Sequence, residues 1–332
     1  MPHVAINGFG RIGRAVFKIL VESSDLRVVA VNDLAPIETL AYLLRYDTVY
    51  GRYGKRVVGE NDALLVDGTR YPFYSETDPA RLPWQQAGVD LVFECTGVFN
   101  KRPQLEAHLK AGAHHVLLSA PGKDEEIVTV VHGVNRPPDG QDRIVSCASC
   151  TTNCITPIIE ILGRRIGLRK AVMTTVHGYT ASQSVVDAPK RKIRSGRAAG
   201  ANLIPATTGA AVATTKALPQ YRGKFDGVAV RVPVPDGSLA DIVWVSTQST
   251  TVEEVNRVLR EESESERYRG IVAVTEDPIV SSDIIREPYA ALVDLGLTQV
   301  IDDDLVKVMC WYDNEWGYAN QMVREARRLL HL

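Results

Sequence analysis

A cysteine just ahead of a helical pattern is the residue of this sequence best suited to nucleophilic chemistry. Cys150 is followed by apolar residues with helical spacing, at Ile155, Ile158, Ile159, Leu162 and Ile166. We therefore expect Cys150 at or near the start of a helix, where unpaired N–H groups and the helix dipole favour a thiolate and lower the pKa of the thiol. Because proline suits only the first turn of a helix, Pro157 implies that the helix either begins later or bends there.

A thiolate nucleophile usually works with a base within hydrogen-bond reach. Among the seven histidines, His177 is the best candidate, because it ends a strand-like, β-branched run at residues 172–176. A histidine at the end of a strand is also often a hydrogen-bonded structural residue. Spacing alone therefore leaves both roles open for His177.

A glycine-rich turn near the start of the chain has the pattern of a dinucleotide-binding site. A short apolar run at residues 4–7 is followed by Gly8, Gly10 and Gly13 in a G-x-G-x-x-G arrangement and then by a helical pattern. Such a turn lets a pyrophosphate approach the backbone and the N–H groups of the next helix. Asp33 follows the last glycine by 20 residues, the spacing at which a carboxylate binds the adenosine ribose hydroxyls. Since this charge would repel a 2′-phosphate, the sequence favours NAD over NADP; the alternative is a glycine turn in an unrelated α/β protein.

Further strands are expected at residues 89–95, 116–119, 127–134 and 143–146, which predicts an open parallel sheet. Ligands of such sheets lie beyond the carboxyl ends of the strands. Thr96 and Ser119 follow two of these ends and are candidates for the nucleotide site. Either residue could equally belong to an ordinary turn.

The second half of the chain has a different pattern. Strands are expected at residues 171–176, 228–232, 240–247 and 306–311, and the alternation in residues 241–245 indicates a sheet with one buried face. We therefore predict a Rossmann-type dinucleotide-binding domain over residues 1–149 and an α+β catalytic domain over residues 150–313, with a mostly antiparallel sheet and helices on one face.

The composition is that of a soluble globular protein. The chain has 332 residues, of which 45% are hydrophobic and 23% charged, enough for two domains. A net charge of −2 gives no reason to expect nucleic acid, and no apolar stretch approaches the roughly 20 residues that cross a bilayer. Five cysteines, an odd number without framework spacing, favour a reducing cytoplasm.

The segment around Cys150 closely resembles the active-site signature of the phosphorylating glyceraldehyde-3-phosphate dehydrogenases, and the resemblance extends over the whole chain. The similar blocks are residues 6–14, 149–154, 174–177, 204–211, 231–233 and 311–318. The resemblance implies that Cys150 attacks the aldehyde carbon and that His177 assists thiolate formation and then takes the hydroxyl proton. Hydride then reduces NAD, and inorganic phosphate resolves the thioester to an acyl phosphate.

The resemblance also implies the binding residues. Thr180 and Arg231 would hold the phosphate of the substrate, Ser149, Thr208 and Gly209 the attacking phosphate, with Thr151 and Arg194 nearby. In the cofactor site, Gly8, Gly10, Arg11, Ile12 and Gly13 would contact the pyrophosphate, Asp33, Thr96 and Ser119 would bind other parts of the dinucleotide, and Asn314 would hold the nicotinamide carboxamide. No metal is implied. The C-terminal helix, residues 314–332, would return to the first domain, and the assembly would be a homotetramer.

Most of these binding residues also have ordinary structural explanations. Arg194 is explained equally well as a solvated loop charge, and Thr208 and Gly209 as turn residues. Arg231 differs, because it stands between Val230 and Val232 in a strand-like run, where a charge must be paired or functional.

Several positions depart from the family pattern. Cys147 replaces an asparagine, which suggests that peroxide could trap Cys150 in a disulfide with Cys147. Thr77 stands where many relatives have an arginine near the adenine, and Ala181-Ser182 replaces a more polar pair. Ala188-Pro189 mixes features of NADP-accepting and NAD-specific forms, so some use of NADP stays open.

Two other functions compete with this interpretation. Erythrose-4-phosphate dehydrogenase would use the same cysteine and histidine with water as acyl acceptor, although Thr180 and residues 119–121 look more like the triose enzyme. A redox or metal protein would use the Cys147-x-x-Cys150 spacing, with Cys154 and His177 as further ligands. A binding role without catalysis leaves no mark in the sequence.

Overall fold

The computed structural model describes residues 1–137 and 143–332, which form two compact units. The first contains Met1–Val130, Arg136–Ala148 and Met322–Leu332, and the second contains Val131–Asn135 and Ser149–Gln321. These limits differ from the domain limits expected at 149/150 and 313/314. Residues 131–135 belong to the second unit because Arg267 donates hydrogen bonds to the carbonyl oxygens of Gly133, at 2.7 Å, and Val134, at 3.1 Å.

A nine-stranded sheet forms the centre of the first unit, in the order β10-β11-β9-β8-β1-β2-β7-β6-β5. Its parallel strands are β1 (His3–Asn7), β2 (Arg27–Asn32), β7 (Thr69–Tyr74), β8 (Leu91–Glu94), β9 (His115–Leu118), β10 (Val128–Thr129) and β11 (Ile144–Ser146). The strands β5 (Val57–Glu60) and β6 (Ala63–Val66) extend it in antiparallel fashion, and β3 (Tyr46–Asp47) pairs separately with β4 (Gly51–Arg52).

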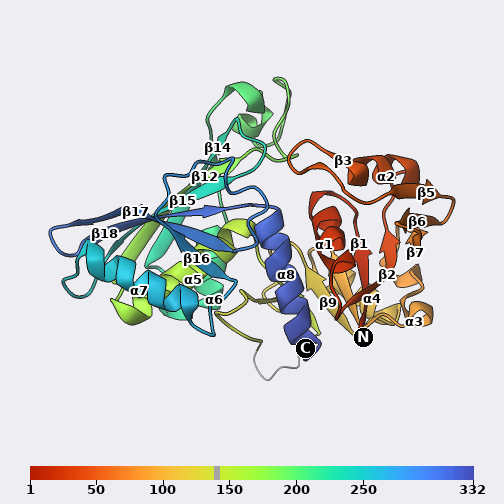
Figure 1. Ribbon diagram of the computed structural model, residues 1–332, viewed down its shortest axis with the longest axis horizontal. Helices are drawn as coiled ribbons and strands as arrows, with labels where there is room; N and C mark the ends of the chain where they lie inside the picture. The colour runs from red at the N-terminus through yellow and green to blue at the C-terminus, as the bar shows by residue number, and fades with distance from the viewer. Residues whose placement is uncertain (138–142) are drawn as a thin grey trace. The chain divides into compact units, whose positions relative to one another are not determined.

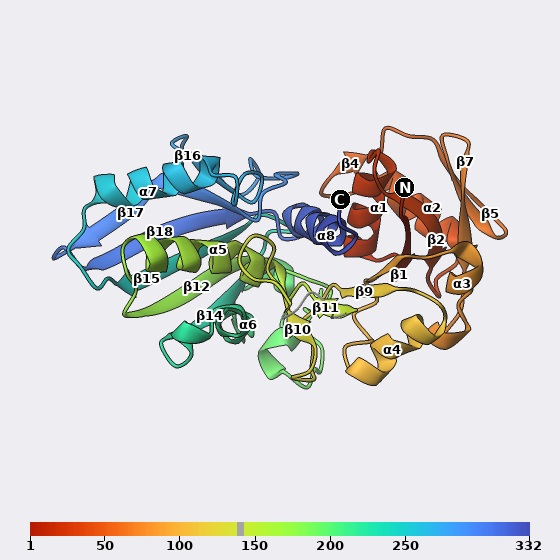
Figure 2. The ribbon, with the colours of Figure 1, turned by 90° about the horizontal axis from the view of Figure 1, so that it is seen from below.

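The helices of the first unit are α1 (Arg11–Val21), α2 (Ile37–Arg45), α3 (Trp84–Ala87) and α4 (Arg102–Lys110), with a 3-10 turn at Pro79–Arg81. Figure 2 shows α1 and α2 on one side of the parallel strands, and α3 and α4 on the other. The middle of β1, β8 and β9 is apolar and fully buried, as expected for parallel strands covered on both faces. This doubly wound arrangement confirms the predicted Rossmann-type fold.

The strand expected at residues 127–134 is much shorter in the structure. Only Val128–Thr129 form β10. A turn then follows, in which the Val134 N–H donates to the Val131 carbonyl at 3.0 Å, and Gly133 adopts a φ of +79°. The apolar run predicted the wrong length because it continues through this turn.

The second unit contains a seven-stranded sheet in the order β13-β14-β12-β15-β18-β17-β16. Its strands are β12 (Lys170–Gly178), β13 (Ile204–Thr207), β14 (Phe225–Val232), β15 (Ser238–Val245), β16 (Val272–Thr275), β17 (Ala291–Ile301) and β18 (Leu305–Tyr312). The pairs β12–β14 and β16–β17 are parallel and the other four are antiparallel. The predicted α+β domain with a mostly antiparallel sheet is therefore confirmed.

The helices of the second unit are α5 (Cys150–Arg165), α6 (Ala210–Ala217) and α7 (Val252–Glu264), with 3-10 turns at Ile193–Gly196, Ala199–Ala201 and Pro219–Tyr221. The core is formed by buried side chains of α5, α7 and the sheet, and Figure 1 shows the ribbons of these elements. Alternate residues of β15, namely Ala240, Ile242 and Trp244, are buried in it. The last helix, α8 (Trp316–Leu329), begins in the second unit and ends in the first.

Membrane-spanning helices are absent from the described residues, since none of their helices is both long and apolar enough.

Glu160 links α5 to Arg267 and Tyr268, which follow α7. Its carboxylate accepts hydrogen bonds from Arg164 at 2.9 Å, Arg267 at 2.9 Å and Tyr268 at 2.5 Å. Burial raises the pKa of Glu160, but the hydrogen bonds and positive charges outweigh burial and bring the pKa below its ordinary value of 4.5. The stabilisation is therefore present above pH 4.5 and is lost as the pH falls further.

We expect Glu160→Gln to lower the free energy of unfolding by about 1–3 kcal/mol at pH 7, because charged hydrogen bonds are lost. Urea unfolding at pH 7 and pH 4 measures this, and the cost should be smaller at pH 4. The exposed Glu266, changed to Gln, is the matched control. An equal effect of the two substitutions at pH 7 would contradict the role of Glu160.

Candidate active site

Cys150 is the first residue of α5, and the two residues before it determine where this helix begins. The Oγ of Ser149, the N-cap, accepts a hydrogen bond from the Thr152 N–H at 3.2 Å. Ala148 has a φ of 55°, a left-handed conformation that costs a non-glycine residue roughly 1 kcal/mol. Of the two possibilities that Pro157 left open, the later helix start is wrong, because the helix begins at Cys150 and the proline lies inside it. Cys150 is thus placed at the positive end of a helix dipole.

His177, next to last in β12, reaches Cys150. Its Nε2 lies 3.4 Å from the Cys150 Sγ, and its ring is buried. The His177 and Tyr312 rings pack in a T-shaped arrangement, with 5.9 Å between ring centroids and 75° between planes. The structure therefore brings together the thiol and the imidazole, a pairing that spacing in the sequence could favour but not establish.

Burial disfavours a charge on either partner taken alone. It raises the pKa of the Cys150 thiol to about 11, although the positive charge of Arg231 and hydrogen bonds from Thr151 act in the opposite direction. Burial also lowers the pKa of His177 to about 4, assisted by the charge of Arg231. Moving the proton from Sγ to Nε2 would create both charges at once, and their attraction, about 5 kcal/mol at an effective dielectric constant near 20, would offset part of this cost. Burial therefore opposes each charge by itself, whereas the two charges formed together stabilise each other.

Strand register explains why Arg231 lies next to His177. The two residues are direct partners in the parallel pairing of β12 and β14. The Arg231 Nη1 lies 2.5 Å from the His177 Nδ1 and 3.1 Å from the Gly178 carbonyl oxygen. Within the described part of the chain, the buried Nε of Arg231 has no hydrogen-bond partner. A guanidinium with an unsatisfied buried donor suits a phosphate.

Tyr312 is a site residue that the sequence reasoning did not select. Its hydroxyl lies 2.9 Å from the Thr151 Oγ1 and 2.7 Å from the Thr175 Oγ1. These contacts occupy the side chain of Thr151, so a ligand would meet its backbone rather than its hydroxyl. Tyr312 belongs to one of the blocks similar to the dehydrogenase family, which was the available signal.

Asn314 is held by two residues that were also missed. The Ser238 Oγ donates to the Asn314 Oδ1 at 2.5 Å and accepts from the Gly178 N–H at 3.2 Å. The Asn314 N–H donates to the Asp236 carboxyl at 3.2 Å. Burial, followed by the charges of Asp313 and Glu315, raises the pKa of Asp236 to about 8. The buried Ser238 thus connects Asn314 to the backbone beside His177.

The remaining predicted phosphate residues are more scattered. Thr208 and Gly209 precede α6, whose first turn contains no acidic residue, and the space beside the Gly209 Cα is open. The Thr180 hydroxyl lies 2.8 Å from the Ser182 Oγ and 3.2 Å from the Gln183 Oε1. Arg194 is exposed in the turn Ile193–Gly196, and its guanidinium makes no hydrogen bond or ion pair to the described residues.

The glycine turn of the first unit fits a dinucleotide. A Cβ on Gly8, whose φ is +92°, would lie 2.5 Å from the Thr96 nitrogen, and one on Gly13 would lie 2.0 Å from the Gly8 oxygen. Gly10 has open space beside its Cα. The first turn of α1, which contains Arg11, Ile12 and Gly13, has neither an acidic residue nor a side-chain cap, so its N–H groups suit a pyrophosphate.

Asp33 is positioned by the same turn. Its Oδ2 accepts from the Phe9 N–H at 2.6 Å, and its Oδ1 accepts from the Ala35 N–H at 2.9 Å. It follows β2, whereas the turn follows β1, the neighbouring parallel strand. Its carboxylate is therefore fixed close to the turn.

Glu94 is the last residue of β8. Its carboxylate is buried, and the sequence reasoning missed it. It accepts hydrogen bonds from the Thr96 N–H at 2.9 Å, from the Thr96 hydroxyl, and from the Asn7 amide at 2.6 Å. The His108 Nε2 lies 3.0 Å from it, and the Trp84 Nε1 donates to the His108 Nδ1 at 3.0 Å. Since Nδ1 accepts from Trp84, His108 is neutral with its proton on Nε2.

The other nucleotide-side residues follow neighbouring strands. Ser119 comes directly after β9, and its N–H donates to the Glu94 carbonyl at 2.9 Å. Arg11 makes an ion pair with Asp47 at 2.6 Å, which leaves its backbone to serve a ligand. Thr96, Ser119 and the glycine turn thus lie at adjacent carboxyl ends of one sheet.

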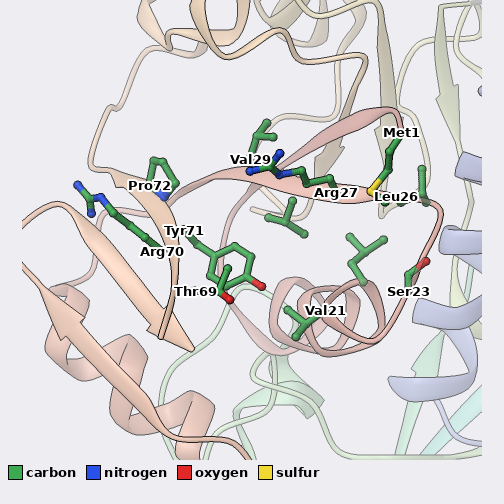
Figure 3. Close-up of a pocket in the computed structure, with 12 residues that line it drawn as sticks. Met1, Val21, Ser23, Leu26, Arg27, Val29, Thr69, Arg70, Tyr71 and Pro72 are labelled. Carbon is green, nitrogen blue, oxygen red and sulfur yellow. The ribbon is translucent and has the colours of Figure 1, made fainter. Parts of the chain in front are cut away.

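A cavity of about 350 Å³ in the first unit lies elsewhere, lined by residues of α1, β2 and β7 that include Met1, Arg27 and Tyr71 (Figure 3). Arg27 is the first residue of β2. The cavity therefore lies toward the amino ends of these strands, opposite the edge where sheets of this kind bind nucleotides.

The redox and metal alternatives depend on how the cysteines and histidines are placed. Among the described residues, no group of three or more His, Cys, Asp or Glu side chains is placed to hold a metal ion. All five cysteines are free. Burial raises the pKa of the Cys147 thiol well above its ordinary value, so Cys147 is itself a poor nucleophile. Its disulfide with Cys150 remains a prediction.

Comparison with known proteins gives consistent matches. A family model for the NAD-binding domain of glyceraldehyde 3-phosphate dehydrogenase matches residues 2–102, and a model for the C-terminal domain of the same enzyme matches residues 149–314. A glyceraldehyde-3-phosphate dehydrogenase of Thermotoga maritima is 48% identical over 335 residues, covering 100% of both chains. Those of Streptomyces coelicolor and of Streptomyces avermitilis (there named dehydrogenase 2) are 47% and 46% identical, each covering 96% of both chains.

The Cys150–His177 contact predicts a characteristic thiol reactivity. In His177→Asn, the thiolate loses its proton acceptor, so the apparent pKa of alkylation should rise toward about 11, the value that burial imposes on Cys150. Iodoacetamide alkylation rates between pH 5 and pH 10 measure this shift. The exposed His331, changed to Asn, should leave the profile unchanged. Identical profiles for the wild type and His177→Asn would show that the contact does not activate the thiol.

Proposed function

The chain belongs to the glyceraldehyde-3-phosphate dehydrogenase family, and we propose that Cys150 and His177 carry out its reaction as nucleophile and base. The reaction is the NAD-dependent oxidative phosphorylation of D-glyceraldehyde 3-phosphate to 1,3-bisphosphoglycerate. The observation that carries the assignment of residues is the 3.4 Å contact between the Cys150 Sγ and the His177 Nε2 at the start of α5.

The proposed mechanism begins with the thiol. As the Cys150 proton moves to the His177 Nε2, the thiolate attacks the aldehyde carbon and forms a hemithioacetal. The helix dipole of α5 and the charge of Arg231 favour the thiolate. The resulting alkoxide takes that proton from the His177 Nε2, and His177, neutral again, can later accept the hydroxyl proton as the carbon is oxidised.

NAD, when bound, accepts the hydride from that carbon. Gly8, Gly10 and the N–H groups of Arg11, Ile12 and Gly13 would hold the pyrophosphate. Asp33 would accept from the ribose hydroxyls, with Thr96 and Ser119 along the same edge of the sheet. Asn314, oriented by Ser238, would hold the carboxamide.

Two phosphate positions follow from the chemistry. Arg231 and Thr180 would bind the phosphate of the substrate, and Ser149, Thr208 and Gly209 would bind inorganic phosphate beside the thioester, with Arg194 moving in from its exposed turn. The open N-terminal turn of α6 and the unsatisfied Nε of Arg231 among the described residues support these assignments. The Thr151 backbone N–H would face the reacting sulfur.

We also propose a homotetramer in the cytoplasm. Exposed apolar side chains support self-association: Val185 is 89% exposed, Ile193 85%, Leu203 70%, and Val172 and Val228, on the sheet of the second unit, 53% each. Light scattering coupled to size-exclusion chromatography tests the assembly. Five free thiols are in keeping with a reducing compartment.

The activity is tested by NADH formation from glyceraldehyde 3-phosphate. Steady-state turnover should require inorganic phosphate, and NADP should serve poorly because Asp33 repels its 2′-phosphate. Cys150→Ser should lower kcat/KM by at least about 10³-fold and His177→Asn by about 10²–10⁴-fold. Turnover that is indifferent to phosphate and faster on erythrose 4-phosphate would favour the sister activity. Full activity of Cys150→Ser would refute the site.

A further inference from the structure

Two buried carboxyl groups lie next to Asn314. Asp236, in the segment after β14, is 2% exposed, and Asp313, directly after β18, is 1% exposed. Their side chains form a hydrogen bond with each other. A carboxylate only accepts hydrogen bonds, so a bond between two carboxyl groups requires a proton on one of them. The pair therefore holds one proton and one negative charge, since two buried charges of the same sign would repel each other.

Backbone donors indicate which of the two groups is the acid. Asp313 accepts hydrogen bonds from the backbone N–H groups of Arg286 at 2.8 Å, Glu315 at 2.9 Å and Trp316 at 2.6 Å. The last two lie at the start of α8, where the helix dipole also favours an anion. Asp236 accepts from the Gly237 N–H at 2.8 Å and the Asn314 N–H at 3.2 Å, both at its Oδ1. The proton of the pair therefore belongs to the Oδ2 of Asp236.

The acid form of Asp236 connects the two segments that hold Asn314. Two residues after Asp236, the Ser238 Oγ donates to the Asn314 Oδ1 at 2.5 Å. While its Oδ1 accepts from Ser238, the Asn314 side chain can present its NH₂ group to a ligand. The hydrogen bond with Asp313 and the bond from the Asn314 N–H both end on the carboxyl group of Asp236. The orientation of the Asn314 amide therefore depends on whether Asp236 is protonated.

Loss of the proton would place a second negative charge in this buried group. Burial, followed by the charges of Asp313 and Glu315, raises the pKa of Asp236 to about 8, so the proton is lost as the pH rises through the mildly alkaline range. Asp236 also packs against the end of β12, where a Cβ on Gly178 would lie 3.4 Å from the Asp236 Cα. The other ionisable residues of the neighbouring elements are Cys150 in α5, His177 in β12, Arg231 in β14 and Arg286 before β17. Burial and the two neighbouring acids outweigh the cations of this set.

We propose that Asp236 is a positioning residue for the cofactor: its proton, shared with Asp313, holds Asn314 in the orientation that binds the nicotinamide carboxamide. This inference rests on the proposed role of Asn314. When Asp236 ionises, its proton passes to solvent, the hydrogen bond to Asp313 is lost, and repulsion between the two carboxylates displaces Asn314. Cofactor binding and proton binding are thus coupled, so that NAD and NADH bind less tightly as the pH rises above about 8.

A direct electrostatic effect of Asp236 on the cofactor would have the opposite sign. The nicotinamide ring of NAD carries a positive charge, which a carboxylate at Asp236 would attract, whereas the ring of NADH is neutral. If attraction alone mattered, NAD would bind more tightly at high pH and NADH would not respond. ADP-ribose lacks the nicotinamide and does not need Asn314, so its affinity would not depend on Asp236 in either case. The three ligands therefore distinguish positioning from attraction.

The test measures the dissociation constants of NAD, NADH and ADP-ribose by isothermal titration calorimetry of the purified enzyme between pH 6.5 and pH 9.5. In the wild type, the constants for NAD and NADH should rise by about 10-fold between pH 7 and pH 9.5, and that for ADP-ribose should not change. In Asp236→Asn, all three should stay constant, because the amide donates to Asp313 and accepts from the Asn314 N–H without titrating. The exposed Asp302, changed to Asn, is the matched control and should respond like the wild type.

The wild type alone can overturn the proposal: NAD and NADH affinities that do not change with pH, or NAD that binds more tightly at pH 9.5, would contradict it even if the variant fails to fold. A pH dependence that persists in Asp236→Asn would also contradict it. Asn314→Ala tests the proposed function separately. If Asn314→Ala weakens NAD binding at pH 7 while Asp236→Asn keeps the pH dependence, the positioning proposal fails alone. If Asn314→Ala binds NAD like the wild type, the proposed cofactor role of Asn314 fails, and the inference fails with it.

Discussion

The register of β12 against β14 and β15 is the constraint on which the chemistry of the second unit depends. It sets His177 opposite Arg231, and the next pair outward, β15 with β18, sets Ser238 opposite Tyr312. Because side chains alternate between the two faces of a strand, a slip of one residue in β12 would turn His177 away from Cys150. The cap formed by Ser149 supplies the other fixed point, since it determines where α5 begins. The thiol and the imidazole are in contact because the start of α5 places Cys150 and the register of β12 places His177 on the same side.

Burial gives this site its chemical character. Burial displaces the pKa values of the imidazole and the thiol toward their neutral forms, so a charge on either group depends on its neighbours. Beside His177, the buried hydroxyls of Tyr312 and Thr175 are hydrogen-bonded to each other. The guanidinium of Arg231 is a fixed positive charge in these surroundings, and its position therefore has a large effect on where protons reside.

Local patterns in the sequence predicted the parts of the structure that local physics determines. The glycine turn, Asp33 and the placement of Cys150 at a helix start depend on neighbouring residues and on one strand–turn–helix unit. Glu94, Ser238 and Tyr312 were missed because their roles come from contacts across many residues, such as the 161 positions between Thr151 and Tyr312. His177 could be preferred but not assigned, since strand register is not visible in one sequence. Pro157 left the exact helix start open, because proline usually suits only the first turn, whereas here it is tolerated inside α5 among fully buried neighbours.

The last helix has a consequence for how the chain is made. Met322, Val323 and Ala326 are buried, and Arg327 pairs with Asp25 at 2.7 Å, a residue about 300 positions earlier. The first unit therefore includes the final residues of the chain, which leave the ribosome after the whole second unit has been synthesised. All nine strands of the sheet of the first unit are synthesised by Ser146, but the packing of this unit is completed only when residues 322–332 have been made. The order of synthesis and the order of folding are thus decoupled, and the nascent first unit is the species most exposed to aggregation and to chaperone binding.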